Sequence, residues 1–139
     1  MIQYRIGNLL DSEAEALVRE QGLELLEDHE LLSNRSSYAI GDYYHEFKLR
    51  ISERDKRDAI LRITSDPSFT TEDLALKELR HQILANRYIG ERMVQNYETE
   101  VSYVREYFEP SGEQGYAPTF RRVSISKIGN ELRFEDIDE

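Results

Sequence analysis

Asp42, Glu46 and Lys48 form the clearest group of residues whose types and spacing could do chemistry. Side chains two apart on a β-strand point to the same face, so these three share a face if residues 43–51 form a strand. Clustered carboxylates can hold Mg²⁺, and a nearby lysine can steady a phosphate under attack. This spacing is therefore compatible with metal-assisted cleavage of a phosphodiester.

The same residues, Glu46-Phe47-Lys48 after Asp42, resemble the metal-binding motif of the PD-(D/E)xK nuclease family. That family carries its first acid on a neighbouring strand, whereas only three residues separate Asp42 from Glu46 here. The first 18 residues are similar to the opening of macro domains, which bind ADP-ribose, but no glycine-rich phosphate loop follows. We assign neither activity and favour a protein with no catalytic residue and no cofactor.

The remaining reactive side chains predict no metal centre. The three histidines are His29, His45 and His81, and no two of them have the helical or strand spacing that brings zinc ligands together. The chain contains no cysteine, which excludes disulfides, cysteine-bound metals and thiol catalysis.

Charge is the strongest compositional signal. The 139 residues include 28 Asp or Glu and 18 Lys or Arg, which gives a net charge of −10. Eight of the acids lie within residues 11–32 and five within residues 131–139, each segment with a single arginine. A surface of this kind repels nucleic acid and anionic membranes and attracts basic protein faces.

Length and hydropathy indicate one domain over residues 1–139, since this is the usual size of a single domain. No apolar run approaches the roughly 18 to 20 residues that span a bilayer. The first residues lack the basic and then apolar form of a signal peptide. We expect a soluble, cytoplasmic protein.

The N-terminal half predicts a helix followed by two strands. Ser12 and Glu15 form a capping box, and Gly22 ends the helix that they open. Residues 23–32 fit a second helix or a continuation of the first, and a break follows at residues 34–37. Alternation then predicts a strand over residues 43–51, pairing with a second strand over residues 59–63 so that Leu49 faces Leu61.

The C-terminal half predicts a long helix followed by a hairpin. Apolar residues spaced by three and four predict a helix over residues 71–109, about 58 Å long at 1.5 Å per residue. Such a helix overhangs a compact domain, so we expect it either to bend or to be covered by a second copy in a homodimer. Gly129-Asn130 predicts a two-residue turn with Ile125 opposite Phe134.

These elements predict an α+β fold with an antiparallel sheet of about four strands in two hairpins. The sheet is expected to pack on the long central helix and on the acidic N-terminal helix, because the strands do not alternate with helices as in parallel sheets.

The favoured function is a small, acidic, non-enzymatic binding protein of the inhibitor, immunity or anti-defence type. Nine tyrosines and no tryptophan suit an interface, since tyrosine buries a ring and keeps a polar tip. The residues expected to bind a basic protein partner are Glu13, Glu20, Glu24, Glu27, Tyr44, Tyr103 and Tyr107. The alternative is a small enzyme or a binder of an anionic, nucleotide-like ligand in a pocket between the sheet and the long helix. Its anion-binding residues are Arg50, Arg62, Arg121 and Arg122, joined by Tyr44.

Overall fold

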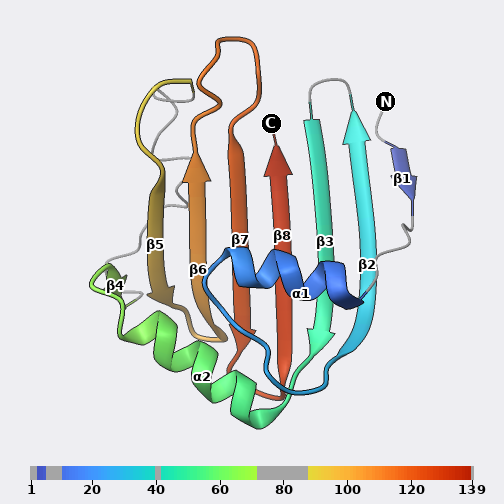
Figure 1. Ribbon diagram of the computed structural model, residues 1–139, viewed down its shortest axis with the longest axis vertical. Coiled ribbons are helices and arrows are strands. Elements are labelled where there is room, and N and C mark those ends of the chain that lie inside the picture. The colour runs from blue at the N-terminus through green and yellow to red at the C-terminus, as the bar shows by residue number, and fades with distance from the viewer. Residues whose placement is uncertain (1–2, 6–10, 40–41, 72–87, 139) are drawn as a thin grey trace.

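The structure is a computed structural model that describes residues 3–5, 11–39, 42–71 and 88–138. Figure 1 shows its elements, which follow one another as β1 (Gln3–Arg5), α1 (Asp11–Glu20), β2 (Glu30–Ala39), β3 (Asp42–Arg50), α2 (Glu53–Thr64), β4 (Phe69–Thr70), β5 (Met93–Glu98), β6 (Ser102–Glu109), β7 (Thr119–Ser126) and β8 (Glu131–Asp138).

The described strands form one sheet in the order β1-β2-β3-β8-β7-β6-β5-β4. Neighbouring strands are antiparallel, except that β4 is parallel to β5. Both helices lie across the same side of this sheet (Figure 1), which we call the helix-covered face. The α+β class is therefore confirmed, while the sheet is wider than the four strands expected. No helix in the described part of the chain is long and apolar enough to span a membrane.

The main core lies between the helices and the helix-covered face. Phe47 of β3 and Phe134 of β8 are fully buried and stack with ring centroids 4.8 Å apart. The helices add side chains to the same cluster, which includes Ala14, Val18, Ala59 and Ile63. β3 thus confirms the strand predicted over residues 43–51. The core confirms the side of the sheet that its apolar residues face.

The predicted strand over residues 59–63 is wrong, because these residues lie in α2. The Ser52 Oγ atom accepts the N–H of Asp55 at 3.0 Å, which caps the helix N-terminus. Ala59 and Ile63 are buried at helical spacing, while Leu61 between them is 65% exposed. Alternation and helical spacing both fit positions 59 and 63, so only the direction of Leu61 separates the two structures.

The second helix expected within residues 23–32 is also absent, and the break expected at residues 34–37 lies inside β2. Gly22 does end α1, with a φ of +79°. Residues 21–29 form a loop in which Leu23 and Leu25 are buried and Leu26 is 60% exposed. Leucines in a loop give the same pattern as one face of a helix, which explains the misreading.

The long helix is not confirmed. Residues 93–98 and 102–109 form β5 and β6, and the described residues 88–92 and 99–101 contain no helix. Residues 72–87 of the prediction lie outside the described ranges. A turn joins the two strands, where the Thr99 Oγ1 atom accepts the N–H of Ser102 at 3.0 Å. The dimer expected through the C-terminal half of this helix loses its structural basis.

The final hairpin is confirmed, but its register is two residues from the prediction. Ile125 pairs with Leu132, and Val123 pairs with Phe134. The turn is therefore longer than the two residues expected at Gly129-Asn130. A two-residue shift keeps every side chain on its own side of the sheet, so the apolar pattern could not detect it.

One buried arginine, Arg105 of β6, joins the two helices to the sheet. Its guanidinium group donates to the backbone oxygen of Gln21 at 2.9 Å and to that of Arg62 at 3.3 Å. Its Nε atom donates to the Asn96 side chain at 2.8 Å. These carbonyls end α1 and α2, where backbone acceptors lack helical partners and a positive charge is favourable. A Cβ at Gly22 would come within 3.0 Å of this guanidinium, so glycine is needed for space as well as for its φ.

We predict that Arg105→Met lowers the free energy of unfolding by about 3 kcal/mol, because it leaves two backbone carbonyls and an amide oxygen without donors. Urea denaturation measures this loss. The matched control is Arg54→Met, since Arg54 is 59% exposed and lies 4.0 Å from its Asp58 partner. The control is expected to cost less than about 0.5 kcal/mol. Equal losses in the two variants contradict the role given to Arg105.

Candidate partner-binding groove

The loop at residues 21–29 is held in place by a buried carboxylate from α2. Asp55 is fully buried, and its two carboxylate oxygens accept the N–H groups of Leu26 and Glu27, each at 3.0 Å. The same residue donates its own N–H to the Ser52 cap. Asp55 therefore starts α2 and fixes the loop beside it, so that Leu26 projects from a constrained backbone.

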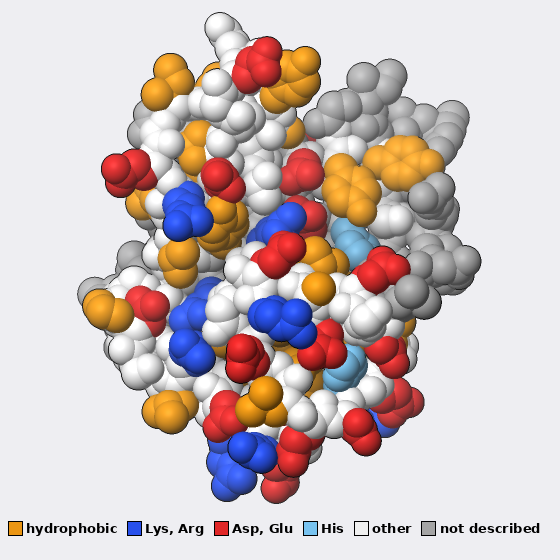
Figure 2. Space-filling view, viewed as in Figure 1, with side chains coloured by type: hydrophobic (Ala, Val, Ile, Leu, Met, Phe, Trp, Pro, Cys, Tyr) orange, Lys and Arg blue, Asp and Glu red, His pale blue; other side chains and the backbone are white. Residues whose placement is uncertain are grey.

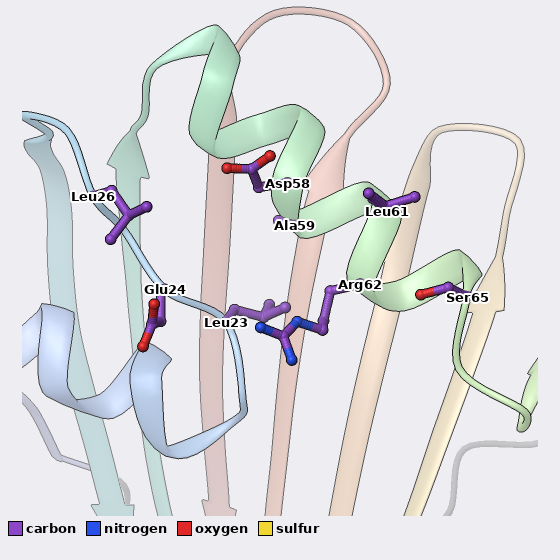
Figure 3. A pocket seen from close by; sticks show the side chains of 8 residues that line it. All are labelled: Leu23, Glu24, Leu26, Asp58, Ala59, Leu61, Arg62 and Ser65. Atoms are coloured by element: carbon purple, nitrogen blue, oxygen red, sulfur yellow. The ribbon is translucent and has the colours of Figure 1, made fainter.

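A groove of about 430 Å³ runs between this loop and α2. Its buried lining includes Leu23 and Ala59, whereas Leu26 on the loop and Leu61 on α2 are 60% and 65% exposed. Figure 3 shows Leu23 and Leu26 on the loop side and Leu61 on the outer side of α2, with the Arg62 side chain reaching from α2 toward the loop. The groove thus combines exposed apolar side chains with polar and charged side chains in its lining.

Among the described residues, two acidic residues and one arginine line this groove. Glu24 and Asp58 line it, and Glu27 is exposed next to Leu26. Figure 2 shows acidic side chains intermixed with lysine and arginine side chains over the lower half of the helix-covered face. Glu13 is exposed in the first turn of α1, while Glu20 at the other end pairs with Arg121 at 2.7 Å. Of the four glutamates expected to bind a partner, Glu24 lines the groove and Glu27 flanks it. Glu20 is paired with Arg121 of the sheet, and Glu13 lies at the other end of α1 and does not line the groove.

The three tyrosines expected at an interface are partly buried and do not adjoin the groove. The Tyr44 hydroxyl lies between two carboxylates, 2.8 Å from Glu46 and 3.0 Å from Glu135. Tyr103 packs against the main core, with the Lys127 ammonium 5.3 Å from its ring centroid. The Tyr107 hydroxyl donates to Glu109 at 2.5 Å. Their hydroxyls and rings therefore serve contacts within the sheet.

Behind the helix-covered face, on the opposite face of the sheet, charged side chains form a row across the strands. The register aligns Glu46 with Glu135, Glu135 with Arg122, and Arg122 with Glu106. All three glutamates are buried. The Arg122 Nε atom donates to Glu135 at 2.8 Å, the Tyr97 hydroxyl donates to Glu106 at 2.8 Å, and Arg133 holds Glu46 through contacts of 2.5 and 3.0 Å. We call these residues the charged row.

In this arrangement Glu46 of the nuclease-like motif at residues 42–48 is bound by Arg133 and Tyr44. Burial alone raises the pKa of Glu46, but hydrogen bonds from Arg133 and Tyr44 outweigh it and hold that pKa below its usual value. Burial and the neighbouring carboxylates raise the pKa of Tyr44. Glu46 is therefore an ionised structural partner of Arg133, and Lys48 lies in register with Arg133 rather than with a second acid.

The arginines expected to bind an anion do not converge on one site. Arg50 pairs with Glu30 at 2.6 Å, Arg121 pairs with Glu20, and Arg122 pairs with Glu135. Arg121 and Arg122 are consecutive on β7, so they point to opposite faces of the sheet. Arg62 alone lines the groove. In the described part of the structure, three of the four arginines are engaged by separate carboxylates, and the anion site of the alternative function stays a prediction.

The histidines are likewise apart. The His45 Nε2 atom lies 2.7 Å from the Asn34 side-chain oxygen, and burial lowers the pKa of His45. His29 lies in the loop before β2, and His81 falls outside the described residues. Within the described ranges, no group of three acidic or histidine side chains is arranged to hold a metal ion.

The residues that shape the groove were missed by sequence reasoning. Ser52 and Asp55 have the spacing of a helix cap, which is a signal that could have placed α2. Asp55 contacts loop residues that lie 28 and 29 positions before it in the sequence, and no local pattern encodes such contacts.

Comparison with known proteins finds no family model, no curated protein and no solved structure that matches this chain. The function is therefore inferred from the chain's own residues and their geometry.

We predict that Asp55→Ala lowers the free energy of unfolding by about 2 kcal/mol, because two loop N–H groups lose their acceptors. Hydrogen exchange at the amides of Leu26 and Glu27 should accelerate at the same time. Asp58→Ala, one turn along the same helix and 52% exposed at the side chain, is the matched control. If the two amides exchange at the wild-type rate in Asp55→Ala, the loop is held by other contacts.

A separate pair of carboxylates, Asp136 and Asp138, lies at the end of β8. Burial and the charge of Asp136 raise the pKa of Asp138 to about 6. The folded state therefore binds more protons than the unfolded state between about pH 4 and 6, so the stability that this group supplies is present at low pH and is lost as pH rises through 6.

We predict that Asp138→Asn raises the free energy of unfolding by about 1 kcal/mol at pH 8, allowing for solvent screening at this half-buried site. The gain should vanish near pH 4, where the wild-type group is already protonated in the fold. Urea denaturation at both pH values measures it. Asp28→Asn removes the same charge from the exposed loop and serves as the control. A gain that is equal at both pH values shows that Asp138 is not the titrating group.

Proposed function

We propose that this chain is a non-enzymatic binding protein that engages a basic protein partner through the acidic face around the loop at residues 21–29. The observation that carries the proposal is the Asp55 carboxylate, which fixes an exposed leucine, Leu26, among exposed acids. A preorganised loop binds with a smaller entropy cost than a mobile one. An inhibitor, immunity or anti-defence role fits this design, since such proteins act by occupying a partner's surface.

The charge of this face supports a basic partner. Glu13, Glu24 and Glu27 are exposed and form no ion pair with any described residue. Charges at the rim of an interface speed association by steering the partner, and they also exclude partners of like charge. Two features of the sequence-based proposal are revised. Glu20 is held by Arg121, and the three tyrosines are engaged within the sheet, so neither is part of the proposed surface.

The test reverses the three exposed glutamates in one variant, Glu13→Lys, Glu24→Lys and Glu27→Lys. The matched control reverses three exposed acids elsewhere in the chain, Glu91→Lys, Glu100→Lys and Glu113→Lys, with the same change in net charge. We predict that proteins captured from a lysate of the source by the wild type and by the control are lost with the first variant. Both variants should unfold within about 1 kcal/mol of the wild type, since the replaced side chains are exposed.

Recovery of the same proteins by the first variant contradicts the proposal. Loss of capture by both variants also contradicts it, because net charge rather than this face would then govern binding. Identification of the captured proteins adds a further condition, since they must present a basic surface.

A further inference from the structure

We propose that the groove between residues 21–29 and α2 seats about two turns of a basic amphipathic helix of the partner, with an apolar side chain held between Leu26 and Leu61. This inference rests on the proposed function and names the partner's binding element. Leu26 and Leu61 come from opposite sides of the groove and are each more than half exposed, while Leu23 and Ala59 are buried beneath them. We expect an apolar side chain placed there to cover part of each leucine, with the Arg62 side chain lying between the two walls.

The exposure of these leucines favours a macromolecular segment over a small ligand. Small-ligand sites enclose most of the ligand surface in a deep cavity. Here two of the three described leucines that line the groove, Leu26 and Leu61, are 60% and 65% exposed to solvent. Exposed apolar side chains next to polar ones are typical of protein-binding surfaces. The groove therefore suits an occupant that continues beyond it.

The long wall of the groove is one edge of a helix, which suits a helical occupant. Asp58, Leu61, Arg62 and Ser65 recur at spacings of three and four along α2, so they share one edge. From Asp58 to Ser65 the wall measures about 10 Å, the length of roughly two helical turns. Two helices pack at interaxial distances of about 8 to 10 Å with side chains interleaved. An amphipathic helix lying in a groove is a common mode of peptide recognition.

The charges in the groove specify the polar side of that helix. Glu24 on the loop and Asp58 on α2 present carboxylates from the two walls. Neither pairs with a described lysine or arginine at hydrogen-bond distance, although Arg54 lies 4.0 Å from Asp58. Lysine or arginine side chains flanking the apolar anchor can therefore reach both acids. Arg62 lies between these walls (Figure 3) and repels a cation placed directly against it, so the residue facing it is uncharged or acidic.

Three synthetic helical peptides of about four turns test the inference. The first carries leucines on one face and lysines beside them. The second replaces the leucines by serines, and the third keeps the leucines and replaces the lysines by glutamates. Amide shifts of the ¹⁵N-labelled protein locate and measure binding. We predict that the first peptide shifts residues 23–27 and 58–65 and binds about tenfold more tightly than the second, while the third does not bind.

Leu26→Ser and Leu61→Ser should each weaken binding of the first peptide about tenfold. The matched control is Ile128→Ser, which removes an apolar side chain that is 90% exposed at the β7–β8 turn and should bind as the wild type does. All three replaced side chains are exposed, so the variants are expected to fold. Arg62→Glu should tighten binding of the first peptide about threefold, since it removes the cation from the groove lining.

Equal binding of the first and second peptides overturns the helix-in-groove inference, as does wild-type affinity in Leu26→Ser, and both leave the acidic-face proposal standing. Binding of the third peptide as tightly as the first removes the role of charge and overturns both proposals. If no peptide binds, the groove inference is wrong, and the capture experiment with charge-reversal variants decides the proposed function by itself.

Discussion

The buried guanidinium of Arg105 is the contact on which the arrangement of the two helices depends. It donates to the carbonyl that follows α1, to a carbonyl in the last turn of α2 and to an amide on β5. Each helix end carries unpaired backbone acceptors, and both ends here share one cation from the sheet. Asp66 adds a carboxylate 3.6 Å from the same group, although burial still lowers the pKa of Arg105. The position of α2 against residues 21–29, and hence the groove, follows from this junction.

Asp55 binds the loop as Arg105 binds the helix ends, by pairing a buried charge with backbone groups. A carboxylate that is removed from water needs donors for both oxygens, and the backbone N–H groups of Leu26 and Glu27 supply them. The loop therefore costs little further entropy when a partner binds it. Arg105 and Asp55 between them anchor residues 21–27 to α2 and to the sheet, although those residues have no regular secondary structure of their own.

The charged row explains why Glu46, which the sequence suggested as a metal ligand, has a structural role. Carboxylates inside a protein are tolerated when cations and hydroxyl donors satisfy them, as Arg133 and Tyr44 do for Glu46. The same pairing lowers the pKa of Glu46 and raises that of Arg133, so both remain charged. The exposed acids near the groove, such as Glu24 and Glu27, form no such pair with any described residue, which is why the proposed binding function is placed there.

The sequence alone determined features that depend on short-range patterns. Gly22 marked the end of α1, the alternation around Phe47 predicted β3 and its inward face, and Gly129-Asn130 marked the last hairpin. The predicted capping box lies close to the start of α1, but the helix begins at Asp11, one residue before Ser12. Their signals lie within a few residues, and the side chains themselves enforce them through caps, alternation and turn conformation. The acidic character of residues 11–32 was also evident from the sequence, because net charge follows directly from composition.

Only the tertiary structure decided the features where two local patterns fit equally well. Residues 59–63 and 93–109 satisfy strand and helix spacings in part, and the choice between them was made by which side chains the rest of the fold buries. The groove required Asp55 to meet Leu26 and Glu27 across almost thirty positions of sequence. The charged row required β3, β8, β7 and β6 to align in register. Contacts between residues far apart in the chain carry no periodic signal, because their partners are selected by packing and by the need to pair buried charge.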